Sequence, residues 1–130
     1  MIRVSVTKQS NFPVSSPKIK NNLRSFFANR GIVSDAEVSI SFVGEKRMLL
    51  LARKYLHEKG VLHSILSFPT AENEKEFVYP PDMIIHLGEI VICYPKAFEE
   101  AKRESKLIDE KVMELVEHGA AHLMGENHGE

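Results

Sequence analysis

The sequence predicts a single α/β (α+β) domain in which a mixed sheet of about four strands is flanked by helices. Its 130 residues, 43% of them hydrophobic, suffice for one compact core and are too few for two. Segments with strand and helical periodicity follow one another as strand, helix, strand, helix, two strands and two helices. This order is typical of helices packed over a mixed sheet. We therefore expect one domain over residues 1–130.

The first half of the chain predicts two strands and two helices. Residues 2–7 alternate apolar and polar side chains, which is typical of a half-buried strand. Ser15 and Pro17 mark a helix start, and Gly31 ends a segment whose apolar residues recur at helical spacing. Residues 36–43 alternate again as a second strand, and residues 44 to about 55 predict a second helix.

The second half predicts two further strands and two further helices. Residues 63–68 and 83–93 have strand composition, and each is closely followed by a proline. Between them, residues 70–81 are acidic and end in two prolines, which indicates a loop. Residues 96–105 and 108–124 have helical periodicity and form the last two predicted elements.

The charge balance argues against a strongly basic nucleic-acid binder, because the net charge is −1 and the calculated pI is about 6.6. The first two predicted helices nevertheless carry a basic bias. Its residues are Lys18, Lys20, Arg24, Arg30, Arg47, Arg53 and Lys54. On charge alone, solvated helix faces explain these residues better than an RNA-binding surface, and RNA binding stays open because charge can be polarised.

The sequence indicates a cytoplasmic protein without a membrane partner. No apolar run approaches the roughly 20 residues of a membrane span. The first residues lack the long apolar segment of a secretory signal. Cys93 is the only cysteine, which excludes an intrachain disulfide, and its apolar neighbours favour a packing role over a reactive thiol.

The last thirteen residues hold three of the six histidines in the pattern H-x3-H-x2-G-x2-H. On a helix, His118 and His122 lie one turn, roughly 6 Å, apart on one face. Gly125 is suited to end that helix and reverse the chain, which brings His128 back as a third ligand. Three neutral imidazoles with an open fourth position are typical of a catalytic zinc site, so we expect one Zn²⁺ here rather than incidental surface histidines.

Gly119 argues against a protease. Zinc proteases with a similar ligand frame carry a glutamate directly after the first histidine, and this glutamate deprotonates the metal-bound water. We therefore expect tag-free protein to leave unstructured casein intact, and a different metal-assisted hydrolysis is the better hypothesis. Metal-dependent casein cleavage that disappears in His122→Ala would contradict this prediction.

The histidine segment resembles the H-G-x-L-H-L-x-G-y-D-H signature of the YbeY family, bacterial zinc-dependent endoribonucleases implicated in ribosomal RNA maturation. Residues 64–69 resemble the T-D-V-L-S-F-P strand of that family, and residues 88–93 resemble its G-D-I-V-I-C strand. The resemblance runs from about Ser39 to His128. It implies a sheet of about four strands with the metal helix packed beside it.

The chain departs from the family pattern at several positions. Asn127 replaces an aspartate, Ala121 a leucine and Glu89 an aspartate. The family commonly has an arginine after a tyrosine, thought to meet RNA phosphate, where this chain reads Y-L-H-E-K-G from Tyr55. The residues that offer a positive group instead are His57, Lys59, Arg53 and Lys54.

The expected chemistry follows from the metal. Zinc lowers the pKa of bound water to about 7 or polarises a phosphoryl oxygen, and either role serves phosphodiester cleavage. A cation near the metal would stabilise the transition state, and the resemblance implies that the segment 53–59 supplies it. We expect Ser67 and His63 to line the cleft, with Glu126 or Glu89 as proton acceptor. His86 is better explained as a structural histidine. The candidate catalytic residues are therefore His57, Arg53, Ser67 and Glu126.

Three functions remain open. The resemblance implies a zinc-dependent single-strand endoribonuclease in ribosomal RNA maturation and ribosome quality control. Its partners would be the ribosomal RNA precursor and the small ribosomal subunit, and not DNA. The alternative is a non-catalytic ribosome-assembly or RNA-binding factor whose metal stabilises the C-terminus. The third is a zinc hydrolase with another substrate. The metal identity also stays open, because three imidazoles accept zinc, nickel, copper or iron.

Overall fold

The structure is a computed structural model that describes residues 1–70 and 84–126. Its sheet has four strands in the order β1-β2-β4-β3, formed by Ile2–Lys8, Ala36–Val43, Ile85–Cys93 and Ile65–Pro69 respectively. β1, β2 and β4 run parallel, and β3 pairs antiparallel with β4 at one edge. The predicted mixed sheet of about four strands is therefore confirmed.

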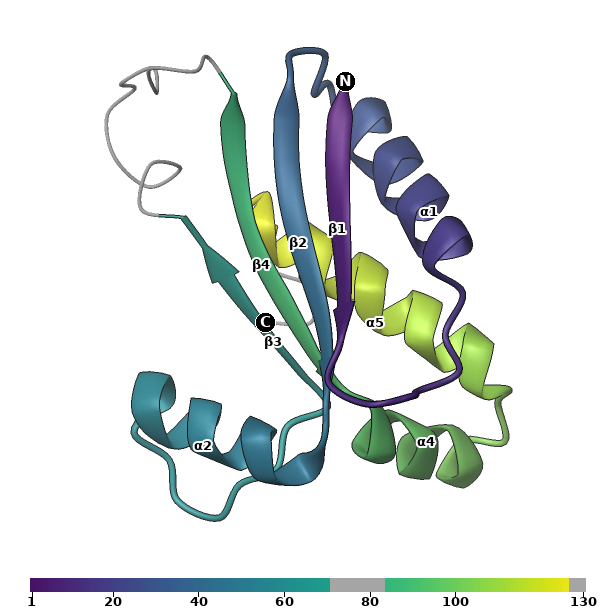
Figure 1. The fold of residues 1–130 in the computed structure, drawn as a ribbon, viewed down its shortest axis with the longest axis vertical. Helices are drawn as coiled ribbons and strands as arrows, with labels where there is room; N and C mark the ends of the chain where they lie inside the picture. The colour runs from purple at the N-terminus through teal and green to yellow at the C-terminus, as the bar shows by residue number, and fades with distance from the viewer. Residues whose placement is uncertain (71–83, 127–130) are drawn as a thin grey trace.

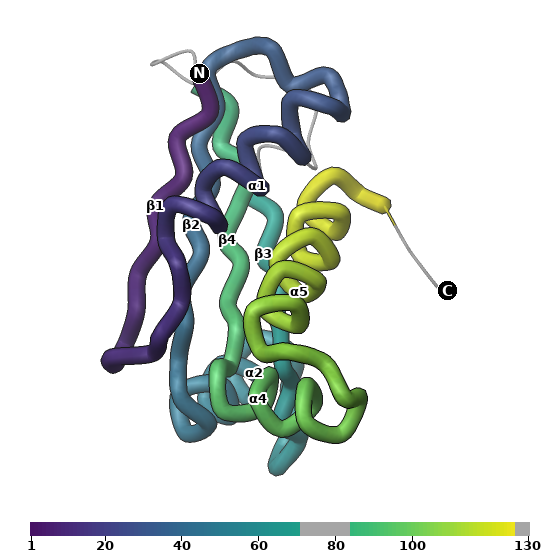
Figure 2. The backbone as a smooth tube through the Cα atoms, turned by 90° about the vertical axis from the view of Figure 1, so that its right-hand side faces the viewer, coloured from purple at the N-terminus to yellow at the C-terminus, as the bar shows by residue number. Residues whose placement is uncertain are grey.

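The described helices are α1 (Ser16–Asn29), α2 (Glu45–Leu56), α4 (Tyr94–Arg103) and α5 (Ile108–Leu123). α1 and α5 cover one face of the sheet, and α2 lies toward the other (Figure 1). Figure 2 shows α1 and α5 together on the same side of the strands. None of the helices in the described ranges combines the length and apolarity that a bilayer crossing requires.

α4 begins two residues earlier than the sequence predicted, at Tyr94 instead of Lys96. Pro95 was interpreted as the end of a strand, and it occupies the first turn of the helix. The first turn tolerates proline because its N–H groups have no intrahelical acceptor and the fixed φ of proline suits the helix. The strand and the helix therefore follow each other without a loop.

The two faces of the sheet carry unequal cores. Strand side chains such as Ile40 and Ile90 are fully buried against α1 and α5, together with Phe27 and Val116. A smaller cluster under α2 contains Met48, Ala52, Leu66, Val91 and Cys93. Burial raises the pKa of the Cys93 thiol, as expected for a packing role. Among residues 1–70 and 84–126, only α2 lies toward the second face (Figure 1).

Gly88 marks the place where β3, β4 and α5 approach most closely. Its φ is +138°, and a Cβ atom added there would lie 2.5 Å from the Phe68 carbonyl oxygen and 2.8 Å from Leu123 Cδ2. The register between β2 and β4 also shifts here, since Glu37 pairs with His86 and Val38 pairs with Gly88. The C-terminal helix is thus packed tightly against the antiparallel edge of the sheet.

A buried lysine joins α4 to α5. The Lys111 side chain is 7% exposed, and its ammonium lies 3.0 Å from Glu104 Oε1 and 3.0 Å from Glu114 Oε1. Burial opposes the charged form, but hydrogen bonds to Glu114 and Glu104 outweigh it, and the pKa of Lys111 is raised. Hydrogen bonds from Lys111 to Glu104, and from Lys106 and Lys111 to Glu114, hold the pKa of both carboxyls below its usual value.

We expect Lys111→Met to cost about 1–2 kcal/mol of unfolding free energy at pH 7, because the carboxylates lose their buried partner. Depressed carboxyl pKa values contribute stability above the unfolded value of about 4.3, and this stability is lost as the pH falls through the folded pKa. The variant should therefore lose less stability than the wild type on acidification below pH about 4.3. Urea unfolding from pH 7 to 3 measures both effects, and parallel pH curves would contradict the expectation.

Candidate metal centre and substrate cleft

Gly119 sets the position of the histidine helix against the sheet. A Cβ atom added there would lie 2.9 Å from both Ile65 Cδ1 and Ile90 Cγ2, and 3.1 Å from Ser67 Oγ. α5 can approach β3 and β4 this closely because residue 119 has no side chain. The position that holds the base in zinc proteases therefore faces packed strands, where a glutamate side chain would not fit.

His118 and His122 come together on α5 as the sequence predicted. The two Nε2 atoms lie 3.1 Å apart, and the ring centroids lie 4.6 Å apart. Two imidazole nitrogens that bind one tetrahedral zinc ion at about 2.0–2.1 Å are separated by about 3.3 Å. The pair therefore fits one ion after a shift of a few tenths of an ångström. The same separation also suits an N–H···N hydrogen bond between neutral rings.

The helix ends where Gly125 was predicted to stop it. α5 ends at Leu123, and Gly125 has a φ of +79°. The Gly125 and Glu126 amides donate to the carbonyls of His122 and Ala121. His128, the predicted third ligand, lies outside the described residues. Within residues 1–70 and 84–126 no three possible metal ligands gather, so the complete ligand set stays a prediction.

Glu126 pairs with Arg30, the residue that follows α1. Arg30 Nε donates to Glu126 Oε2 at 2.8 Å, and the Arg30 guanidinium lies 3.6 Å from the centroid of the Phe26 ring. Arg30 thus holds the Glu126 carboxylate by a charge-assisted hydrogen bond. The ion pair anchors the turn after α5, and the role of Glu126 as a proton acceptor stays a prediction.

Ser67 lies beside the histidine helix. Its hydroxyl donates to the Gly119 carbonyl oxygen at 3.4 Å, which brings β3 next to the residue after His118. Neighbouring side chains on a strand point to opposite faces. Phe68, the next residue, therefore lies on the other face of β3 and contacts Tyr55 of α2, with ring centroids 5.1 Å apart.

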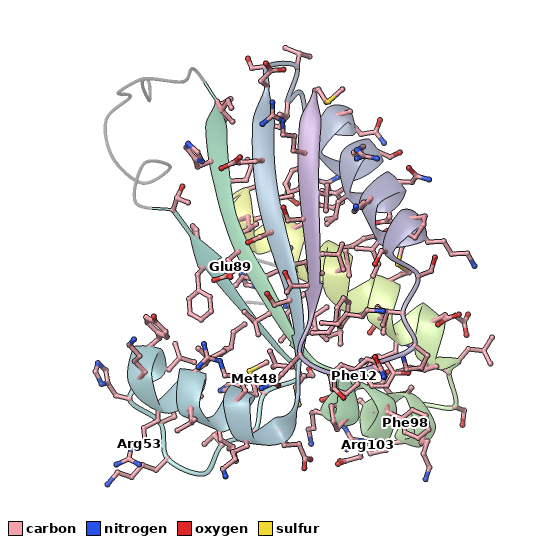
Figure 3. All side chains as sticks on the ribbon, viewed as in Figure 1. Phe12, Met48, Arg53, Glu89, Phe98 and Arg103 are labelled. Carbon is pink, nitrogen blue, oxygen red and sulfur yellow. The ribbon has the colours of Figure 1, made fainter. Side chains whose placement is uncertain are left out.

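Arg53 and His57 lie on the α2 side of the sheet. Arg53 points away from the strands (Figure 3) and lines a surface pocket of about 360 Å³ with Lys46 and Lys59. His57 caps the C-terminal end of α2 in the left-handed conformation and is exposed. The described structure does not bring either residue beside the histidine pair, because α2 and α5 pack on opposite faces of the sheet.

The other two histidines of interest have carboxylate partners. His63 Nε2 lies 2.5 Å from Glu58 Oε1, within the segment that connects α2 to β3. His86 Nδ1 lies 2.7 Å from Glu37 Oε1 on the neighbouring strand β2. The pairing of His86 agrees with the structural role that the sequence favoured.

The sheet face opposite α1 and α5, called the open face here, carries a cleft that was not predicted from the sequence. Two adjoining pockets, of about 650 Å³ and about 260 Å³, share Phe68 and Glu89. Figure 3 shows Glu89 on β4, on the face turned away from α5. The outward positions of β1 and β2 are polar, including Ser5, Ser39 and Ser41. The alternation of apolar and polar residues on these strands could have indicated the cleft, because it makes one face of the sheet polar.

The fold and the histidine pair define an α/β domain with two neighbouring histidines on the helix that packs at the antiparallel edge of its sheet. A profile of the family described as "Endoribonuclease YbeY" matches residues 5–130. The chain belongs to this family, whose name describes an endoribonuclease.

Curated relatives agree with the profile. The Endoribonuclease YbeY of Macrococcus caseolyticus is 30% identical over 86% of this chain and 71% of its own length. That of Thermus thermophilus is 31% identical over 86% of this chain and 76% of its own length. A further relative from Thermodesulfovibrio yellowstonii is 37% identical over 70% of this chain, which spans only 53% of that protein.

A solved structure supports the fold alone. The solution structure of a Thermotoga maritima protein superposes with a TM-score of 0.58 and covers 98% of this chain and 75% of that protein. Its sequence identity to this chain is 24%.

Proposed function

We propose that this protein is a zinc-dependent endoribonuclease that cleaves single-stranded RNA in ribosomal RNA maturation and ribosome quality control. The observation that carries the proposal is the separation of 3.1 Å between His118 Nε2 and His122 Nε2 in a member of an endoribonuclease family. His128 would complete the ligand set. The expected partners are a ribosomal RNA precursor and the small ribosomal subunit, and the expected compartment is the cytoplasm.

The residues around the histidine pair suit a hydrolytic site. A bound zinc ion would supply Lewis acidity to a phosphoryl oxygen and a water of lowered pKa. His118 and His122 would hold the ion from one helix face, while Gly119, on the buried side of α5, lets the helix approach β3. Ser67 presents a hydroxyl on the strand nearest to this helix. The ion pair between Arg30 and Glu126 restrains the chain two residues before the third proposed ligand.

The cations of α2 and the segment after it support RNA as the substrate. The side chains of Lys46, Arg47, Arg53 and Lys59 form no ion pair or hydrogen bond within the described parts of the chain. In contrast, Lys106, which lies between α4 and α5, and Lys111 of α5 are paired with glutamates. Unpaired lysines and arginines are the groups that contact nucleic-acid phosphates. The net charge of the chain is thus close to zero although α2 is a basic helix.

Cleavage of an end-labelled single-stranded fragment of ribosomal RNA precursor tests the proposal. Zinc-loaded protein should produce discrete fragments, and a chelator or His118→Ala should abolish them. Glu99→Gln, at an exposed carboxylate on α4, is the control and should cleave like the wild type. Cleavage that persists in both the chelated protein and His118→Ala would overturn a metal-dependent mechanism.

The separation of Arg53 and His57 from the histidine pair favours a second candidate, a non-catalytic RNA-binding assembly factor. This candidate expects the RNA to bind without being cut under any metal condition. Binding measured beside cleavage on the same fragment therefore separates the two functions.

A further inference from the structure

The smaller of the two pockets on the open sheet face lies between α2 and the strands. Its volume is about 260 Å³. Its lining includes Ser41 on β2, Arg47 and Tyr55 on α2, Phe68 on β3 and Glu89 on β4. The pocket thus collects side chains from every strand except β1, together with one helix.

Two aromatic rings form one wall of this pocket. Tyr55 and Phe68 have ring centroids 5.1 Å apart with planes inclined by 56°, and Tyr55 is 51% exposed. The Lys54 ammonium lies 5.1 Å from the Tyr55 ring centroid. Exposed aromatic rings beside lysine and arginine are typical of surfaces on which bases of single-stranded RNA stack. The wall can therefore hold a flat heterocycle.

Two unpaired charges of opposite sign line the same pocket. Arg47 and Glu89 are both exposed, and neither side chain has an ion pair or hydrogen bond within residues 1–70 and 84–126. They also do not bind each other, although both border one cavity. A ligand that matches the pocket must accept hydrogen bonds from a guanidinium and donate them to a carboxylate.

We propose that this pocket binds a guanine base of single-stranded RNA, an inference that rests on the proposed RNA substrate. Guanine has adjacent N1–H and N2–H donors for both oxygens of Glu89, and O6 and N7 acceptors for Arg47. Adenine and cytosine place a ring-nitrogen acceptor beside their amino group, and uracil flanks its single donor with two carbonyls. Guanine therefore satisfies both charges, while each other base leaves an acceptor facing the carboxylate.

The edge strand β3 separates the pocket from the histidine helix α5. Ser67 of β3 contacts Gly119 of α5, and the following residue, Phe68, lines the pocket on the other face. An RNA strand that crosses the edge strand β3 passes from the guanine to the histidine pair. Recognition of the base would thus fix the cut at a constant distance from guanine.

Fluorescence anisotropy with short labelled uridine-rich RNAs tests the proposal. The RNAs differ only at one central guanosine, adenosine or cytidine, and a chelator prevents cleavage. The guanosine RNA should bind about tenfold more tightly than the other two, as a bidentate contact to one base implies. Glu89→Gln should reduce this preference to about twofold or less, because the amide has only one acceptor oxygen. Tyr55→Ala should weaken all three RNAs alike, because stacking does not depend on the base.

Glu99→Gln is the matched control, since it makes the same change at an exposed carboxylate on α4 and should keep the preference. Thermal unfolding of each variant verifies that it is folded. Equal binding of the three RNAs to the wild type would overturn the guanine pocket and leave the proposed endoribonuclease standing. A guanosine preference that survives in Glu89→Gln would also overturn it. If no RNA binds at all, the proposed function and this inference fail together.

Discussion

His118→Ala and His122→Ala should each reduce bound metal from about one equivalent to a trace. Each variant leaves at most two of the three proposed ligands, and two imidazoles hold a zinc ion far more weakly than three. The described structure has no other histidine on α5 to replace the lost one. Elemental analysis of untagged protein, purified without added chelator, measures the change.

His86→Asn is the control for this experiment, because His86 lies on the other face of the sheet and pairs with Glu37. It should retain the metal content of the wild type. One equivalent of metal in both His118→Ala and His122→Ala would mean that the ion binds elsewhere. Loss of metal in the control as well would point to a general defect in folding instead of a lost ligand.

Local patterns were sufficient to predict the elements of this fold. Alternating residues such as Ile2 and Val4 of β1 do bury one face, and Gly125 does end α5. These features depend on a few neighbouring residues and on the conformations that each residue type favours. The pair formed by His118 and His122 is predictable for the same reason, since helical spacing alone brings two rings together.

The remainder of the site depends on contacts that local patterns do not encode. Arg53 and His57 were expected near the metal because they fall where the resembled family has its phosphate-binding arginine. In the structure, α2 and α5 lie on opposite faces of β3 and β4, so these two residues do not lie beside the histidine pair. The ion pair between Arg30 and Glu126 joins residues almost a hundred positions apart and has no local signal.

The cleft on the open sheet face was not predicted, because local sequence patterns do not show which part of a sheet face another element covers. Polar outward residues on β1 and β2 predict a solvated face, and a solvated face and a binding face have the same pattern. Only the position of α2 over one end of this face creates the pocket with Glu89 and Phe68. Recognition of such a site requires the tertiary arrangement.

Gly88→Ala should destabilise the protein by about 3–5 kcal/mol, a large part of the total stability of an ordinary domain. Two causes add. The φ of +138° is unfavourable for any residue with a Cβ atom, and the new methyl group would lie 2.5 Å from the Phe68 carbonyl oxygen. That oxygen belongs to the backbone of β3, so relief of the clash requires the paired strands to separate. Urea unfolding followed by circular dichroism measures the loss.

Gly31→Ala separates the two causes. Gly31 also has a positive φ, +90°, but a Cβ atom there meets nothing within 4 Å. Its substitution should therefore cost only the backbone strain, about 1–2 kcal/mol. The difference between the two variants measures the close packing of β3, β4 and Leu123 of α5. If Gly88→Ala unfolds at the same urea concentration as Gly31→Ala, this packing contributes little. If the difference is as large as expected, the position of the helix that carries His118 and His122 depends on a residue without a side chain.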